Sequence, residues 1–134
     1  MVGDKVSNLI IKLKNASKAK LATVSFPYTK FSESILETLK KDGFIKDFSE
    51  KKKKGLKAFG TLEIEVAYEE DGSPKIQDVK RVSKLSKRVY VKAGDVKPLR
   101  SGYGLTVFST PKGVMSDKEA KAEHVGGEEL FRIW

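Results

Sequence analysis

A polar, turn-rich segment divides this chain into two halves with different hydrophobic patterns. Residues 69–74 consist of acidic residues, glycine, serine and proline, which favour turns over regular structure. Before this segment the apolar residues recur at helical spacing or alternate, and after it they fall mainly in short strand-like runs. A chain of 134 residues suits one or two small domains. We therefore predict an α+β protein of two small α/β domains, at residues 1–70 and 74–134.

The N-terminal half begins with a predicted helix and a predicted strand. Apolar residues recur at helical spacing from Val6 to Ala16, and Asp4 can cap the start of this helix. Residues 21–26 then form a short apolar run that is typical of a strand, which we expect Pro27 to stop.

A second helix and two strands complete the predicted N-terminal domain. Residues 30–42 carry an apolar face that includes Phe31, with Thr29 as the candidate N-cap and Gly43 after the last turn. The remaining predicted elements are an extended stretch at residues 44–48, a lysine-rich loop at residues 51–55 and a strand with one buried face at residues 62–68.

The C-terminal half is predicted to be mostly β, with one short helix. Ser116 and Glu119 fit a capping box, in which the serine caps the helix and the glutamate reaches back to its amide. The helix should end near His124, because two glycines follow. The predicted strands lie at residues 76–82, 88–91, 105–109 and 130–134.

Positive charge is concentrated in one short segment. The formal net charge of the chain is +9, and residues 80–100 hold eight basic side chains against a single acidic one, Asp95. Such a bias favours a polyanionic partner, although charge alone does not separate RNA, DNA and an anionic membrane. The segment resembles strands rather than an amphipathic helix, which argues against a membrane surface.

Several classes of protein are excluded or disfavoured. The chain has no cysteine and a single histidine, His124, so disulfides are excluded and a tetrahedral zinc site is not expected. We predict no metal and no cofactor. No serine or carboxylate stands at a recognisable catalytic spacing from His124, so we expect no enzyme. No apolar run approaches the roughly 20 residues that span a bilayer, and no signal peptide is evident, so an intracellular protein is the expectation.

Two short motifs could contact nucleic acid. In a strand, Arg88 and Tyr90 would share one face, and a cation beside a stackable ring is a recurring way to hold unpaired bases. The alternative is a tyrosine half-buried at a strand edge. The turn at residues 109–113 offers two hydroxyls and the ammonium of Lys112 to ribose, bases and phosphate, although it could also be a turn only.

The order of the motifs in the C-terminal half resembles one family. The motifs, in order, are Arg81-Val82-Ser83, Arg88-Val89-Tyr90, Gly102 and Gly104, the run from Ser109 to Asp117, Glu119-Ala120 and Val125-Gly126-Gly127-Glu128. This order resembles the bacterial type of small-subunit ribosomal protein eight, and the N-terminal half matches the family in pattern.

The resemblance implies a fold, a function and partners. It implies two small α/β domains, the second of which binds an irregular helix in the central domain of the small-subunit rRNA and helps subunit assembly. Ribosomal proteins five and twelve are the implied neighbours in a cytoplasmic ribosome, with a monomer when free and no membrane partner. The implied RNA-binding residues are Arg81, Lys84, Lys87, Arg88, Tyr90, Ser109, Thr110, Pro111, Lys112, Gly113, Gly126, Gly127 and Glu128.

Two alternatives to this function remain open at the level of sequence. A translational repressor that binds a similar structure in its own operon mRNA would use the same residues but would not co-sediment with small subunits at high salt. An enzyme would depend on His124, and its activity would change in His124→Ala.

Overall fold

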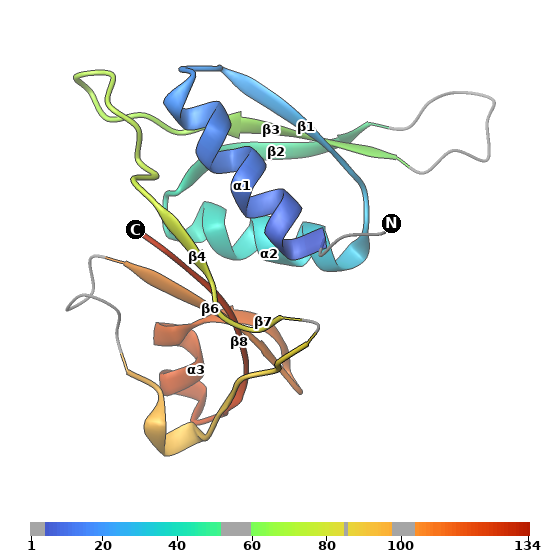
Figure 1. Ribbon diagram of the computed structural model, residues 1–134, viewed down its shortest axis with the longest axis vertical. Helices are drawn as coiled ribbons and strands as arrows, with labels where there is room; N and C mark the ends of the chain where they lie inside the picture. The colour runs from blue at the N-terminus through green and yellow to red at the C-terminus, as the bar shows by residue number, and fades with distance from the viewer. Residues whose placement is uncertain (1–4, 52–59, 85, 98–103) are drawn as a thin grey trace. The chain divides into compact units, whose positions relative to one another are not determined.

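The computed structural model describes residues 5–51, 60–84, 86–97 and 104–134, and these fall into two compact units (Figure 1). One unit is Leu9–Ile76, and the other is Gln77–Trp134 together with residues 5–8. Each unit combines helix with an antiparallel sheet, which confirms the predicted α+β class.

The first unit follows the predicted order of helix, strand, helix, strand, strand. Its elements are α1 (Lys5–Lys18), β1 (Thr23–Pro27), α2 (Lys30–Lys41), β2 (Ile45–Lys51) and β3 (Thr61–Val66). The first four described residues of α1 are grouped with the second unit.

Helix α1 forms where the apolar period predicted it. Its apolar stripe is almost fully buried, as expected for a helix that packs one face against a core. The buried residues of this stripe are Val6, Leu9, Ile10, Leu13 and Ala16. The predicted cap, Asp4, lies outside the described residues.

Helix α2 has the predicted caps but a different apolar edge. Thr29 Oγ1 accepts a hydrogen bond from the Ser32 amide at 3.0 Å, and Gly43 follows the helix with a φ of 81°. The prediction that Phe31 belongs to the buried face is wrong, because its side chain is 40% exposed. The buried stripe is centred on Leu36 and Leu39, and Phe31 falls at its margin in the first turn.

Strand β3 is the centre of a three-stranded sheet with the order β1-β3-β2. Alternation places Leu62, Ile64 and Val66 in the core, as predicted. Strand β1 ends at Pro27, which is its last residue and lies opposite Thr61. A proline is tolerated there because β1 is an edge strand, whose free side needs no backbone donor.

The lysine-rich stretch is only partly described. The prediction that Lys51 belongs to a loop is wrong, because it is the last residue of β2. Its Nζ lies 2.8 Å from Glu63 Oε2. Residues 52–55, the rest of the predicted loop, lie outside the described residues.

The second unit is mostly β, with one short α-helix among its described residues. Its elements are β4 (Val79–Arg81), β5 (Tyr90–Val91), the 3-10 helix η1 (Ala93–Asp95), β6 (Leu105–Thr110), β7 (Gly113–Ser116), α3 (Asp117–Glu123) and β8 (Gly127–Ile133). The sheet runs in the order β4-β8-β6-β7, and β5 also pairs with β8.

Several strands of this unit differ from the sequence prediction: β5 covers only residues 90–91 of the predicted 88–91, and β8 begins at Gly127 rather than at Leu130. Strand β4 is shorter than predicted, since the amides of Gln77 and Asp78 donate to the Trp134 carbonyl outside the ladder. Strand β7 was not predicted at all. Its four residues include the end of a turn and the helix cap Ser116, and these two strong local signals mask so short a strand.

Helix α3 closes one side of the sheet beside β6 and β7. Phe108 of β6, Met115 of β7 and Ala120 of α3 are buried together with Val96, which follows η1. The predicted N-cap is confirmed, because Ser116 Oγ accepts from the Glu119 amide at 3.2 Å. The glutamate carboxylate lies 3.4 Å from the same hydroxyl.

We expect Ser116→Ala to lower the free energy of unfolding by about 1 kcal/mol, within the roughly 0.5–2 kcal/mol range for lost N-caps. The alanine cannot accept from the Glu119 amide, so one helix donor loses its partner. Urea unfolding of the full chain measures this, with the exposed Ser49→Ala as the control. Equal stability of Ser116→Ala and Ser49→Ala would contradict the assigned cap.

Candidate nucleic-acid interface

Three side chains from three neighbouring strands form a row on one face of the C-terminal sheet. Tyr90 of β5 lies opposite Glu128 of β8, and Glu128 lies opposite Ser109 of β6 on its other side. Directly opposed residues in antiparallel strands project from the same face. The row therefore presents a phenol ring, a carboxylate and a hydroxyl side by side.

An open groove of about 490 Å³ lies over this row. Seven of its eight lining residues are among those for which the family resemblance implied RNA contact, and Val91 is the eighth. The lining residues are Tyr90, Val91, Ser109, Thr110, Pro111, Gly126, Gly127 and Glu128. Residues separated by up to 38 positions in the sequence are thus brought to one surface.

Tyr90 is the most exposed large hydrophobic residue of the described chain, at 71%. The alternative that it is half-buried at a strand edge is therefore wrong. An aromatic ring so exposed beside a groove is free to stack on a planar group.

The turn beside the groove is held by the side chain of Thr110. Pro111 and Lys112 form a two-residue connection between β6 and β7, and Gly113 follows with a φ of 115°, which favours glycine. The Thr110 hydroxyl accepts from the Lys112 amide at 3.1 Å and donates to the Gly113 carbonyl at 2.8 Å. Thr110 thus shapes the turn.

The hydroxyl of Ser109 makes no hydrogen bond within the described part of the chain, so it can serve a ligand in the groove. Lys112 is 58% exposed, and its Nζ lies 3.2 Å from Glu123 Oε2, in a carboxylate that is 51% exposed. Such exposed pairs contribute only about 0–1 kcal/mol, so this lysine can exchange its partner for a phosphate at little cost.

The two glycines of the groove are required by the protein itself. A Cβ on Gly126 would lie 2.3 Å from the Val91 carbonyl oxygen, and one on Gly127 would lie 2.3 Å from the Ser109 carbonyl oxygen. The family resemblance implied that these glycines contact RNA. The structure shows that they first allow β8 to approach its neighbouring strands.

Glu128 is bound by an arginine across the sheet. Arg88 Nη1 lies 3.0 Å from Glu128 Oε2 and 3.3 Å from Oε1. The Glu128 side chain is only 14% exposed, whereas Arg88 is 47% exposed. The carboxylate at the centre of the groove is therefore paired rather than a bare negative charge.

None of the predicted basic residues, Arg88 and Lys112 included, is among the residues that line the groove. Lys84 and Lys87 are exposed in a tight turn closed by two backbone hydrogen bonds of 2.8 and 3.0 Å between them. Arg81 is half-buried, and its guanidinium donates to the Leu130 carbonyl. These residues can add attraction around the site, but they are not part of the row.

Ser83 supports this basic turn and was not predicted as a site residue. It is fully buried, and its hydroxyl accepts from the Val89 amide at 2.9 Å and donates to the Val89 carbonyl at 3.2 Å. These two hydrogen bonds fix the segment that presents Arg88 and Tyr90. A lone serine beside a charged turn gives no local signal of this role.

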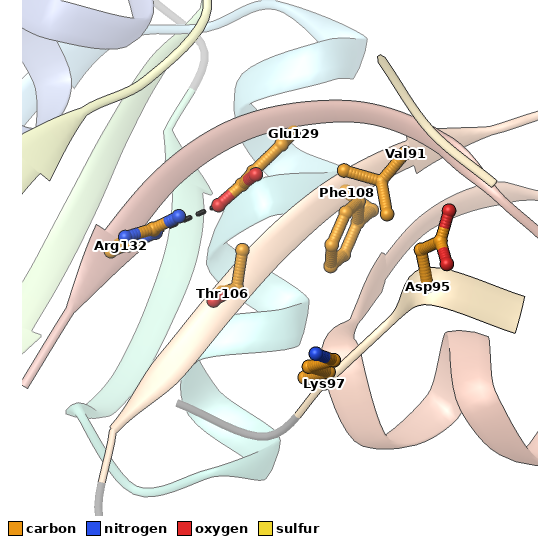
Figure 2. Close-up of a pocket in the computed structure, with 7 residues that line it drawn as sticks. All are labelled: Val91, Asp95, Lys97, Thr106, Phe108, Glu129 and Arg132. Carbon is orange, nitrogen blue, oxygen red and sulfur yellow. Dashed lines mark hydrogen bonds and ion pairs between the residues drawn. The ribbon is translucent and has the colours of Figure 1, made fainter. Parts of the chain in front are cut away.

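A second pocket, of about 240 Å³, has a different character (Figure 2). Its wall includes Glu129, only 8% exposed, whose Oε1 accepts from Arg132 Nε at 2.7 Å. The register between β6 and β8 shifts beside Glu129, and the Glu129 carboxylate points toward Arg132. Asp95 and Lys97 complete the charged lining. Two acids balance two bases, so this pocket offers a phosphate backbone no net attraction.

Within the described residues, no group of three or more histidines or carboxylates is placed to hold a metal ion. None of the described helices is both long and apolar enough to cross a membrane.

Comparison with known proteins identifies the family. The model of the family described as ribosomal protein S8 matches residues 4–134. The small ribosomal subunit protein uS8 of Caulobacter vibrioides (strain NA1000 / CB15N) is 42% identical over 133 residues, which cover 99% of this chain and 98% of that protein. Its namesake from Helicobacter pylori (strain Shi470) is 42% identical over 134 residues, the full length of both chains.

The chain belongs to the ribosomal protein S8 family. This confirms the resemblance recognised in the sequence. It also makes the chain a ribosomal protein and not an enzyme, as predicted.

We expect Gly127→Ala to destabilise this family member by at least about 1–3 kcal/mol, the usual cost of overpacking. The new methyl group would press on the Ser109 carbonyl, which cannot move without disturbing the β6–β8 ladder. The matched control is Gly94→Ala, because nothing lies within 4 Å of a Cβ there. Thermal or urea unfolding compares them, and equal midpoints would contradict the close approach of the strands.

Proposed function

We propose that the chain is a structural component of the small ribosomal subunit that binds the central domain of the small-subunit rRNA directly and helps subunit assembly. The observation that carries this proposal is the row of Tyr90, Glu128 and Ser109 beside the exposed 109–113 turn. The relatives are named as small ribosomal subunit proteins, which supports the assignment to that subunit.

The chemistry of the groove suits unpaired or splayed bases. A Tyr90 ring can stack on a base, the Glu128 carboxylate can accept from a base amino group or a 2′-hydroxyl, and Ser109 can donate or accept. Regular A-form RNA hides its base edges in a narrow major groove. The target is therefore an irregular helix, whose widened groove or displaced bases these groups can reach.

Charge provides the affinity that these few contacts do not. Residues 80–100, the sequence segment that contains Tyr90, carry eight basic side chains. Lys84 and Lys87 are among them, in their exposed turn. Neutralising phosphates releases counterions, so this part of the binding falls with salt. Position and selectivity come from the groove.

The finer parts of the proposal follow the family resemblance. We propose that residues 1–70 and 74–134 act as the two domains, and that ribosomal proteins five and twelve are neighbours in the cytoplasmic ribosome. The chain is proposed to be a monomer when free. The same groove could bind a similar structure in the operon's own mRNA and repress translation, because it recognises RNA shape. Sedimentation separates the roles, since a ribosomal protein co-migrates with small subunits at high salt.

Tyr90 tests the stacking contact. Tyr90→Phe should change affinity for a central-domain rRNA transcript little, whereas Tyr90→Ala should lose roughly 1–3 kcal/mol, the scale of base–aromatic stacking. Phe31→Ala removes another exposed aromatic ring, from α2, and should leave binding unchanged. If Tyr90→Phe costs as much as Tyr90→Ala in a filter-binding or fluorescence titration, the hydroxyl and not the ring makes the contact.

Lys112 tests the phosphate contact. Lys112→Ala should weaken binding and flatten the plot of log K against log salt by about 0.7–0.9, the effect of one lost phosphate contact. Lys121→Ala, which removes an equal charge from α3 outside the groove, should change the slope less. Identical slopes for the parent chain and Lys112→Ala would remove Lys112 from the phosphate contacts.

A further inference from the structure

We propose that Arg88 is a positioning residue that acts through Glu128, and not a phosphate ligand. This inference rests on the proposed RNA-binding role of the groove. It names the residue that allows the Glu128 carboxylate to accept hydrogen bonds from RNA. The evidence is the pair of contacts, 3.0 and 3.3 Å, from a single guanidinium nitrogen to both oxygens of Glu128.

A bare carboxylate in an RNA groove would oppose binding. Glu128 occupies the middle of the row between Tyr90 and Ser109, and only 14% of its side chain is exposed. A bound RNA would remove the remaining water and bring phosphates close, both of which disfavour an uncompensated negative charge. Arg88 makes the site locally neutral while leaving the carboxylate oxygens further lone pairs for RNA donors.

Solvent screening limits what this pair contributes to fold stability, because Arg88 is 47% exposed. Arg88 is held in place by local structure, because the buried Ser83 hydroxyl bonds both backbone groups of the adjacent Val89. The guanidinium is thus delivered to Glu128 by a fixed segment, which suits a role in orienting the carboxylate before RNA arrives.

A neutral ion pair and a direct phosphate contact by Arg88 predict different slopes of affinity against salt. A neutral Arg88–Glu128 pair contributes no net charge toward counterion release. Arg88→Met leaves a bare carboxylate and should weaken binding about tenfold to a hundredfold, the scale of a hydrogen bond to a charged group. Adding Glu128→Gln removes that negative charge and should restore part of the lost affinity and the parental salt slope.

The experiment uses the full chain and two RNAs, a transcript of the central domain of a bacterial small-subunit rRNA and a regular duplex of the same base composition. Affinity is measured from low to moderate salt for Arg88→Met, Glu128→Gln and the double variant, after circular dichroism has shown that each is folded. Arg88→Lys is included because one nitrogen contacts both oxygens, so an ammonium can replace it, and it should retain most of the affinity.

Lys87→Met is the matched control. Lys87 is the neighbouring basic residue, exposed, and without a side-chain partner in the described part of the chain. Lys87→Met should weaken binding to both RNAs and flatten the salt slope by about 0.7–0.9. Its effect should add to that of Glu128→Gln. Arg88→Met, in contrast, should be rescued by Glu128→Gln.

Two outcomes overturn the inference. If the double variant binds more weakly than Arg88→Met, with a slope flatter than that of the parent by about one counterion, Arg88 is a direct phosphate ligand and only the positioning role fails. If Glu128→Gln and Tyr90→Ala both bind the central-domain transcript as tightly as the parent, the groove is not the RNA site. The proposed function of the groove and the inference then fail together.

Discussion

The close approach of β8 to its neighbours at Gly126 and Gly127 is the constraint on which the candidate site depends. No side chain fits at either position, since a Cβ would lie 2.3 Å from a backbone oxygen of the adjoining segment. This approach allows the next residue, Glu128, to pair with Tyr90 on one side and Ser109 on the other. Without it, the ring, the carboxylate and the hydroxyl would not share one surface.

The ion pair between Arg88 and Glu128 explains how an acidic residue can belong to a surface that we propose binds RNA. Glu128 is oriented by Arg88, which the buried Ser83 holds in place through Val89. A net charge of +9 favours any polyanion and does not distinguish one RNA from another. Selectivity has to come from a few groups in fixed positions, and these are found where three strands meet.

Local patterns predicted most of the fold but only part of the site. The apolar stripe of α1 and the caps at Thr29 and Ser116 are local signals, and the structure contains all of them. Phe31 was misassigned because the helical period does not say how far a core extends along a helix. Strand β7 was missed because its four residues are shared with a turn and a cap.

The site depends on partners that are distant in sequence. Family resemblance supplied Tyr90, Ser109 and Glu128 as separate residues, and no spacing rule could place them in one row. Arg88 and Glu128 are 40 residues apart, so their pairing follows from strand order and not from any local motif. The internal role of Gly127 is likewise visible only once β6 lies beside it.

Ultraviolet crosslinking followed by peptide mapping tests the central claim, that RNA occupies the groove over β5, β6 and β8. The intact chain is bound to a central-domain transcript of a bacterial small-subunit rRNA, irradiated and digested with trypsin. The account predicts a nucleotide adduct on the peptide of residues 89–92, which contains Tyr90. Adducts confined to peptides from the β1-β3-β2 unit would contradict it.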